Sequence, residues 1–571
     1  MNLARLSSGF LFHVVFSTIV AFILLFIFQK ISPTLSILSL MMGTMIAVSI
    51  LPKIKFRSSF ELSKTSLVDR VVGLFLIWAL FRLFMYNIYY DADSIKTLLP
   101  NNLGDLPFHL SQIASFQEGP FPFLNPSFVG EYFRYPFGVN LYSSLWDSLG
   151  VPIHTNFFIF GFACSVVLLL FLYDQGKWLA WVCLLLGGGS VGYQFLSDGL
   201  WINHQDQIPW KNFLTSMWIP QRGLLIGLPI GLTILNFTMR SVEDRNQFTI
   251  FDYKLIGFLW GILPFFHTHS FVFISLFLAV LLLRPNRWPL FLNMFKFALI
   301  PAACWMLFVT EFFTGSGKLS FQVGWQGSLD NPLVFWFKNL GGVLILFVIS
   351  ALFAWRSPER KERLELFVIF MGFFIFFQFV IFSKWDWDNL KLLIWPVIGL
   401  SGLAWRCFVS KLNVNVQLFL ALTIGFTGFV STVASMNGQR KGIEIYDKKE
   451  IYKVRELVKG IDKQERILAL PTFNHALGFL GYKLVMGYDG HLWSHGVDFK
   501  KEKDAIDSIY NFKDDFDNAV DLVDAKFVLF SKRESAAFGL DSDAFTEKML
   551  QNGYLVRSRV DDALLFEAKS K

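Results

Sequence analysis

The chain has 571 residues, of which 54% are hydrophobic, 18% aromatic and only 17% charged, and its mean hydropathy is +0.48. A soluble protein of this length would carry more charge and far fewer than 67 phenylalanines, so the composition indicates an integral membrane protein with many spans. The net charge of +7 lies in short basic clusters between apolar runs, a pattern that orients helices in a bilayer and speaks against nucleic-acid binding.

Apolar runs of about 20 residues predict the membrane-spanning helices, because a helix of that length crosses the hydrocarbon core with its backbone amides paired. The run 255–283 is too long for one helix and contains the polar triplet His267-Thr268-His269, so it predicts two short helices that meet at a polar turn. The other spans are predicted near 9–29, 33–52, 68–88, 156–173, 178–197, 219–238, 289–312, 334–354, 364–383, 389–405 and 416–434. By this criterion the chain has about thirteen helices in the membrane.

The basic loops give the orientation, since Lys and Arg are held on the cytoplasmic side of a membrane. With two helices in 255–283, the basic clusters in 53–70, 240–254, 284–287 and 356–363 all fall on one side. This arrangement places the N-terminus in the cytoplasm and the chain beyond residue 436 outside it. The lone glycosylation sequon, at Asn236, lies within a span, which favours a bacterial inner membrane over the endoplasmic reticulum.

The last part of the chain differs in character, because it is richer in charge and its apolar runs shorten to strand length. Strands are predicted at 465–472, 482–489, 525–533 and 563–569, and helices at 448–461, 517–523 and 542–552. We therefore expect a transmembrane domain over residues 1–436, with a catalytic outer loop at 88–155, and a small extracytoplasmic α/β domain over 437–571.

Polar side chains that are costly near a membrane gather on the predicted outer face, and such groups are functional candidates by default. The outer loop 88–155 contains Asp91, Asp93, Asp105, His109, Glu131, Arg134 and Tyr135. Other outer loops and span ends contribute Arg222, His267, His269, Lys384, Asp388 and Lys391. This placement predicts chemistry at the outer surface of the bilayer, where a lipid-borne substrate can meet its acceptor.

Asp105 and His109 lie one helical turn apart, so both side chains are expected to face one cavity. Asp105 suits the N-cap of that helix, with Pro107 in the first turn. In the alternative interpretation Asp105 only caps an interfacial helix, 106–117, whose apolar residues lie on lipid.

Two pairs of residues raise the question of a metal ion. Asp91 and Asp93 form an Asp-x-Asp pair, which would suit a divalent cation. His267 and His269 are zinc-ligand types, but the sequence offers no third ligand nearby, so polar packing or contact with phosphate is favoured. No metal site is therefore assigned, and a divalent cation at the Asp-x-Asp pair remains the alternative.

Three basic residues of the outer face, Arg222, Lys384 and Lys391, suit a phosphate held at the boundary between lipid and water. A low dielectric constant strengthens such pairing. Structural ion pairs with Asp386 or Asp388 are the alternative.

With these residues in place, the chain resembles the GT-C superfamily of membrane glycosyltransferases, which use polyprenyl-phosphate sugars. The resemblance rests on an acidic outer loop followed by an interfacial helix, on GDLPFHLSQIASF (104–116) and FRYPFGVNLYSSLWDSLG (133–150), and on a C-terminal outer domain. The architecture is similar to that of the lipid A aminoarabinose transferases and the C-mannosyltransferases. The adjacent Asp-Glu of protein O-mannosyltransferases and the WWDYG signature of oligosaccharyltransferases are missing.

The resemblance implies an inverting transfer of a sugar from a polyprenyl phosphate to a hydroxyl group of a glycan, glycolipid or protein. It implies that Asp105 is the base, with Asp93 or Asp91 as substitutes. Arg222, with Lys384 or Lys391, would then stabilise the departing lipid phosphate. The expected partners are this donor, the acceptor and membrane lipid, without nucleic acid.

Two other classes of function remain as alternatives. A lipid or glycan transporter or flippase would show repeats related by symmetry and charges deep within the helices. A noncatalytic subunit for glycan assembly would retain the fold with a degenerate site. In the last domain, His491 and His495 lie in an aromatic segment, 488–499, that either caps the cavity, holds acceptor glycan or forms a packed domain edge.

Overall fold

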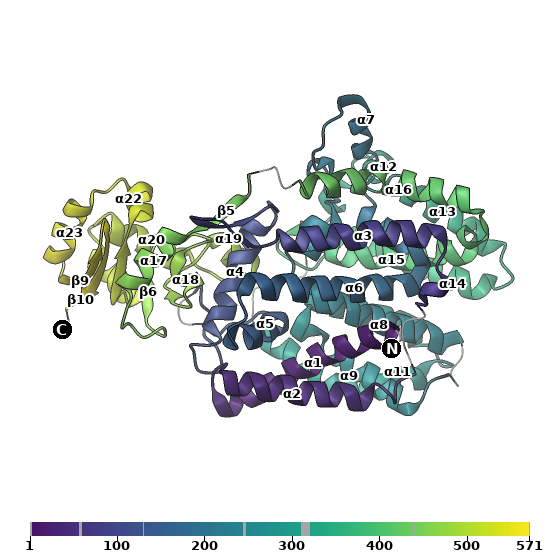
Figure 1. Ribbon diagram of the computed structural model, residues 1–571, viewed down its shortest axis with the longest axis horizontal. Coiled ribbons are helices and arrows are strands. Elements are labelled where there is room, and N and C mark those ends of the chain that lie inside the picture. Colours follow the sequence, from purple (N-terminus) through teal and green to yellow (C-terminus); the bar gives the residue numbers. More distant parts are fainter. Residues whose placement is uncertain are drawn as a thin grey trace.

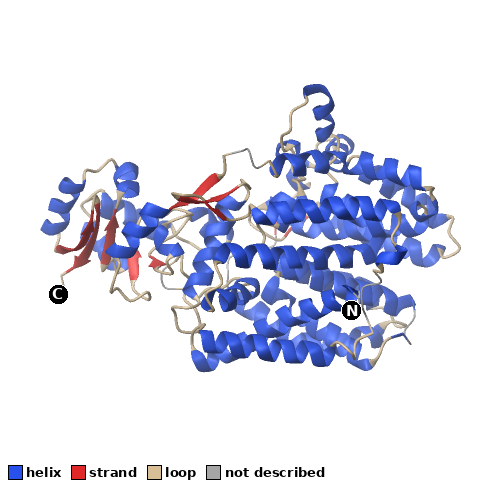
Figure 2. Ribbon diagram, viewed as in Figure 1, coloured by secondary structure: helices blue, strands red, loops and turns tan. Residues whose placement is uncertain are grey.

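The computed structural model describes residues 3–55, 60–128, 131–243, 247–309, 320–437 and 441–569. Most of the helices lie side by side in an elongated bundle, and an α/β part is attached at one end (Figure 1, Figure 2). The helices up to residue 437 are α1 (Leu3–Phe28), α2 (Pro33–Ile50), α3 (Leu67–Met85), α4 (Asn102–Ser115), α5 (Gly138–Ser148), α6 (Ile153–Trp181), α7 (Phe195–Asp198), α8 (Leu224–Glu243), α9 (Ile250–Phe266), α10 (Thr268–Leu282), α11 (Trp288–Val309), α12 (Pro332–Leu340), α13 (Gly342–Trp355), α14 (Arg360–Phe376), α15 (Leu390–Cys407) and α16 (Val414–Ser435).

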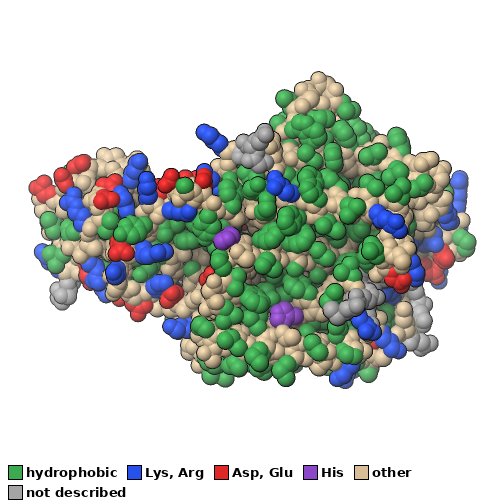
Figure 3. Space-filling view, viewed as in Figure 1, with side chains coloured by type: hydrophobic (Ala, Val, Ile, Leu, Met, Phe, Trp, Pro, Cys, Tyr) green, Lys and Arg blue, Asp and Glu red, His purple; other side chains and the backbone are tan. Residues whose placement is uncertain are grey.

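The surface of the bundle is that of a membrane protein. Hydrophobic side chains cover its flank, whereas Lys, Arg, Asp and Glu gather over the C-terminal part and at the opposite end (Figure 3). Ile27, Leu74 and Leu422 are 74%, 68% and 70% exposed, which would be unfavourable in water over so wide an area. The chain is thus an integral membrane protein of mainly helical fold.

Seven helices among the described residues are long and apolar enough to cross a membrane, or eight if the bent pair α12 and α13 is one span. The about thirteen spans expected from apolar runs include α9, α10 and α14, which have only 17, 15 and 17 residues. The larger total therefore stays a prediction.

The predicted break between the spans 156–173 and 178–197 is present within α6. The backbone leaves helical geometry at Lys177, whose φ is 52°. Trp181 Nε1 then donates a hydrogen bond of 2.7 Å to the Leu169 carbonyl oxygen, although twelve residues of straight helix would separate the two by about 18 Å. The freed amide of Trp178 donates to the carboxylate of Asp69 at 3.1 Å. The chain therefore turns back on itself at this point.

The polar turn predicted within 255–283 is confirmed. Helix α9 ends at Phe266, and His267 adopts an extended backbone conformation before α10 begins. The His267 side chain caps α10, because its Nδ1 accepts a hydrogen bond of 3.1 Å from the Ser270 amide. The turn places both histidines of the triplet at the same end of the two helices.

The predicted span 334–354 is instead two helices, α12 and α13, which meet at an angle of 107°. Gly341 between them has a φ of 52°, a conformation that favours glycine. An added Cβ there would meet the backbone of Gly189 at 3.0 Å, so close packing also requires glycine. An apolar run alone does not reveal this bend.

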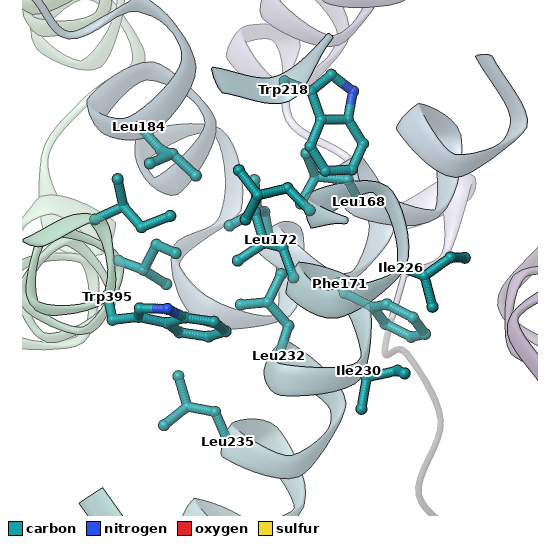
Figure 4. Close-up of a cluster of buried hydrophobic side chains, with 14 of the residues drawn as sticks. Leu168, Phe171, Leu172, Leu184, Trp218, Ile226, Ile230, Leu232, Leu235 and Trp395 are labelled. Atoms are coloured by element: carbon teal, nitrogen blue, oxygen red, sulfur yellow. The ribbon is translucent and has the colours of Figure 1, made fainter. Parts of the chain in front are cut away.

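The core of the bundle is built from large apolar side chains of α6, α8 and α15. Figure 4 shows Leu172 of α6 beside Leu232 of α8, with Leu168 of α6 next to Trp218 and the ring of Trp395 from α15 at one side of the cluster. Trp395 is fully buried and stacks on Phe273 of α10 with ring centroids 5.3 Å apart. This packing fixes the helix ends that carry the candidate site.

Beyond residue 441 the elements are β5 (Ile443–Asp447), α17 (Lys448–Leu457), β6 (Arg466–Leu468), α18 (Ala476–Phe479), β7 (Lys483–Leu484), α19 (Asp489–Ser494), α20 (Lys500–Tyr510), α21 (Phe516–Val523), β8 (Phe527–Phe530), α22 (Lys532–Phe538), α23 (Ser542–Gln551), β9 (Tyr554–Val560) and β10 (Ala563–Ala568). Their five-stranded sheet has the order β7-β6-β8-β10-β9. Strand β6 is parallel to both of its neighbours, β7 and β8. Strand β10 is antiparallel to both of its neighbours, β8 and β9. All four predicted strands and all three predicted helices are present, while β5, β9, α18, α19, α20 and α22 were not predicted.

The C-terminal part is joined to the outer loop in two ways. β5 extends the hairpin of β1 (Tyr89–Tyr90) and β2 (Ser94–Thr97) into a three-stranded antiparallel sheet. Leu106, Leu110 and Ile113 of α4 share a buried cluster with Ile445 and Leu477. The alternative that these α4 residues lie on lipid is therefore wrong. The division at residue 437 stays a prediction, because the hydrophobic core crosses it.

Candidate functional site

A cavity of about 780 Å³ opens where the helical bundle meets the C-terminal part. Its lining comes from the first turns of α4, the junction of α9 and α10, residues 382–391 before and within α15, α19 with the residues that follow it, and residues within 135–136 and 211–223. Seven of the predicted site residues line it, namely Asp105, Tyr135, His267, His269, Lys384, Asp388 and Lys391.

Asp105 is the carboxylate of the α4 wall. Asn101 occupies the N-cap of α4, so Asp105 lies within the first turn, and its prediction as the N-cap is wrong. Gln221 Nε2 donates a hydrogen bond of 2.5 Å to Asp105 Oδ2. Burial raises the pKa of Asp105 to about 6, while the nearby charge of Lys391 lowers it and that of Asp388 raises it. A carboxylate with this pKa is a competent base near neutral pH.

Lys391 and Asp388 form an ion pair opposite Asp105. Lys391 Nζ lies 2.9 Å from Asp388 Oδ1, and the two side chains are only 9% and 17% exposed. Ser383 Oγ donates a hydrogen bond of 3.0 Å to the other carboxylate oxygen, Oδ2. The structural ion pair that the sequence left open is therefore present, and its lysine still lines the cavity.

His267 and His269 form part of the same wall, with ring centroids 5.6 Å apart. Ser270 occupies Nδ1 of His267, and His269 Nε2 is buried with no hydrogen-bond partner among the described residues. Within the described ranges, no group of three or more His, Cys, Asp or Glu is placed to hold a metal ion. The two histidines are thus positioned for polar contact with a ligand in the cavity.

Helix α19 of the C-terminal part forms the roof. His491 and His495 lie beside Phe108, with ring centroids 4.9 and 5.2 Å away, and His495 also lies 5.2 Å from Tyr135. Burial lowers the pKa of His491 to about 4 and that of His495 to about 3, so both imidazoles are neutral at pH 7. Of the interpretations left open for this segment, the structure shows that it caps the cavity.

Arg222 and His109 do not line the cavity, contrary to the prediction that they converge on it. Arg222 is 3% exposed, and its guanidinium donates to Asn140 Oδ1 at 3.1 Å and to Ser143 Oγ at 2.5 Å. His109 is 2% exposed and shares Asn140, whose Nδ2 lies 2.9 Å from His109 Nδ1. Both side chains therefore form hydrogen bonds with α5 and do not line the cavity.

The other four predicted residues also lie away from the cavity. Asp91 is exposed and its carboxylate binds Lys96 within the β1–β2 hairpin, and the Asp93 carbonyl accepts the Lys448 amide at 2.9 Å. Both aspartates lie in the turn of this hairpin, which pairs with β5, and neither lines the cavity. Glu131 and Arg134 flank the bridge between Leu124 and Tyr132 and do not line the cavity either.

Several lining residues were not predicted. The aromatic ones include Trp385, Trp387, Tyr488 and Trp493, and the polar ones include Lys211 and Ser216. The alternation of Trp with Asp in KWDWDNLK (384–391) is a signal that sequence reasoning could have used, since exposed tryptophans beside carboxylates suit a polar, ring-shaped ligand. Lys211 and the α19 residues are brought in by the tertiary fold alone.

Similarity to known proteins is found among solved structures. No family model and no curated protein sequence matches the chain. Solved structures similar to it include ArnT from Cupriavidus metallidurans (10% identity, 89% of this chain and 100% of that chain) and an oligosaccharyltransferase from Archaeoglobus fulgidus (12%, 82% and 70%). The arabinofuranosyltransferase AftD from Mycobacteria is similar over 89% of this chain and 40% of its own length, at 13% identity.

Each of these three structures gives a TM-score of 0.46. The function proposed next rests on the residues of the cavity.

Proposed function

We propose that the protein is a membrane glycosyltransferase that moves a sugar from a polyprenyl-phosphate donor to a hydroxyl group of an acceptor. The observation that supports this most is the cavity itself. It combines Asp105, whose pKa is near 6, with the Lys391–Asp388 pair and two further lysines, Lys211 and Lys384. A base and a cluster of cations on facing walls are what a displacement at a glycosyl phosphate requires.

The proposed step is a single displacement. Asp105 accepts the proton of the acceptor hydroxyl as its oxygen forms a bond to the anomeric carbon. The bond from that carbon to the phosphate oxygen breaks, and its electron pair leaves with the polyprenyl phosphate. The configuration at the sugar is inverted, so no nucleophilic side chain is needed. Positioned proton transfer of this kind typically contributes about 10² to 10⁴ in rate.

The lysines of the cavity would stabilise the departing phosphate, whose negative charge grows in the transition state. Lys391 is the best placed of them, because its charge already acts on Asp105. This role replaces the one expected for Arg222, which is committed to Asn140 and Ser143. Lys211 and Lys384 are the other two lysines among the described residues that line the cavity.

The acceptor would enter beneath α19. Trp385 and Trp493 are 52% and 46% exposed at the cavity, and Tyr488 is 37% exposed. Flat aromatic faces beside neutral imidazoles favour a ring-shaped, uncharged group such as a sugar. We therefore infer a glycan or glycolipid acceptor at the extracytoplasmic face of a bacterial inner membrane, the side opposite the basic loops.

Replacement of Asp105 tests this function. Asp105→Asn keeps the shape and the contact with Gln221 but removes the base, so we expect transfer to fall by about 10² to 10⁴. The variant should fold normally, because burial of the ionised carboxylate is unfavourable and Asn removes that charge. Transfer of labelled sugar in proteoliposomes and the thermal midpoint in detergent are the two measurements.

The matched control is Asp91→Asn, which removes an exposed carboxylate of the same outer loop outside the cavity. It should retain the transfer rate of the unaltered protein. Equal rates for Asp105→Asn and Asp91→Asn, with both proteins folded, would exclude Asp105 as the base.

A further inference from the structure

A second cavity, of about 630 Å³, lies between α10 and α14 and shares no lining residue with the first. Its walls are mostly apolar, with Leu276 and Val280 from α10 and Leu364, Val368 and Phe373 from α14. Val280 and Val368 are 49% and 65% exposed, so this groove opens on the flank of the bundle, where lipid chains would lie.

One end of the groove is basic. Arg284 and Lys361 line it together with Glu365. The Arg287 guanidinium donates hydrogen bonds to both carboxylate oxygens of Glu365, of 2.6 Å to Oε1 and 3.1 Å to Oε2. The Arg284 guanidinium forms an ion pair with the same carboxylate, at 3.1 Å from Oε1. Two arginines therefore share one carboxylate, Lys361 lines the same end of the groove, and the Arg284 side chain remains 49% exposed. The excess positive charge at this end is accessible to an anion.

The groove is long enough to hold an acyl chain of one membrane leaflet. Lys361 and Phe376, at its two ends, are fifteen residues apart on α14, which corresponds to about 22 Å of helix. Half of the hydrocarbon core measures about 15 Å. An acyl chain can thus lie along α14 while its headgroup stays at the basic end.

We propose that the groove between α10 and α14 binds an anionic phospholipid, with one acyl chain along α14 and the phosphate at Arg284 and Lys361. Basic pockets between membrane helices bind acidic lipid headgroups in this way. The groove lies on the side predicted to be cytoplasmic, at the other end of α10 from His267 and His269. The site is therefore separate from the proposed transfer reaction.

Gly372 provides a way to close the groove without altering its charge. It lines the groove, and a Cβ added to it would meet no atom within 4 Å. Gly372→Leu would therefore extend a side chain into the groove, where its Cβ meets no other atom, and leucine favours the helix more than glycine does. This variant separates loss of the site from failure to fold.

The experiment measures binding of phosphatidylglycerol to the full-length protein in detergent, by native mass spectrometry and by the rise in thermal midpoint. Arg284→Gln combined with Lys361→Gln should weaken binding by about 30-fold, since each cation near an anionic lipid contributes about 1 kcal/mol. Gly372→Leu should weaken it at least tenfold. The control, Arg356→Gln, removes an exposed cation of the same side that does not line the groove, and should bind normally.

Three results would overturn the proposal. One is unchanged phosphatidylglycerol binding in both groove variants. Another is equal binding of zwitterionic phosphatidylcholine, because the basic end would then have no role. The third is stabilisation by a polyprenyl monophosphate that Gly372→Leu abolishes, which would assign the groove to the lipid of the donor.

Discussion

At the scale of single residues, the pKa of Asp105 sets the pH dependence of transfer. The base must be ionised, and burial raises its pKa to about 6, so activity should fall about tenfold per pH unit below pH 6 and level off above it. The donor is a phosphodiester and stays ionised throughout this range, and His491 and His495 are already neutral. The initial rate of transfer between pH 4.5 and 8, at a saturating donor concentration, measures this limb.

The same pKa shift predicts the direction of a stability effect. The pKa of Asp105 is higher in the folded protein than the ordinary value of 3.8, so this group favours the folded state most below pH 4 and loses that contribution as the pH rises through 6. Asp105→Asn should therefore not lower the thermal midpoint at pH 7.

For the pH dependence of transfer, a transfer rate that stays constant from pH 4.5 to 8 would show that another group, or no base, acts in the reaction.

The Lys391–Asp388 pair combines a structural and a functional role, which a double substitution separates. Lys391→Met and Asp388→Asn each leave a buried charge without its partner, and each should destabilise the protein by about 3 kcal/mol. The double variant removes both charges of the pair, so it should be more stable than either single variant. Chemical denaturation in detergent measures these differences.

The transfer rates of these three variants should not follow the order of their stabilities. Because Lys391 is proposed to hold the donor phosphate, both Lys391→Met and the double variant should lose transfer even where stability returns. A double variant that regains full transfer would show that the lysine is purely structural.

At the scale of elements, the close contact of α9 and α11 depends on two glycines four residues apart. A Cβ on Gly261 would lie 2.5 Å from the Ala298 carbonyl oxygen, and one on Gly257 would meet the Met294 carbonyl oxygen. Small residues at this spacing let membrane helices approach each other closely. The contact holds α9 in place and, through it, the turn at His267.

Gly261→Val should therefore destabilise the protein by about 1–3 kcal/mol through overpacking. Gly372→Ala on α14 is the control, since its new methyl group meets open space and should be neutral or slightly stabilising. Thermal midpoints in detergent compare the two. A Gly261→Val protein as stable as Gly372→Ala would mean that α9 and α11 separate readily.

The sequence predicts an element when the residues of that element determine it, and misses it when contacts with distant parts of the chain do. The turn at His267 was predicted, because three polar residues interrupt an apolar run and the basic loops require a hairpin there. The bend at Gly341 was not, because its cause is the approach of Gly189 from a distant part of the chain. Strand β9, although it has seven residues, was missed because most of its side chains are exposed or half-buried, so no regular apolar alternation marks it.

At the scale of the whole molecule, the candidate site was predictable where it is built from helix ends. Asp105, His267 and Lys391 were found because the orientation of the spans places them on one face, and the structure brings them to one cavity. The contribution of α19 was left open, since it joins the site only through packing of the C-terminal part on α4. Arg222 was misplaced, because topology gives the membrane side of a residue but not the direction of its side chain.

The most direct measurement is a structure of the protein in a lipid nanodisc with a non-hydrolysable polyprenyl-phosphate sugar analogue. We expect the phosphate oxygens within about 4 Å of Lys391 Nζ, with the sugar between Asp105 and α19. A bound analogue whose phosphate lies outside the cavity, or whose anomeric carbon faces away from Asp105, would contradict the proposed reaction.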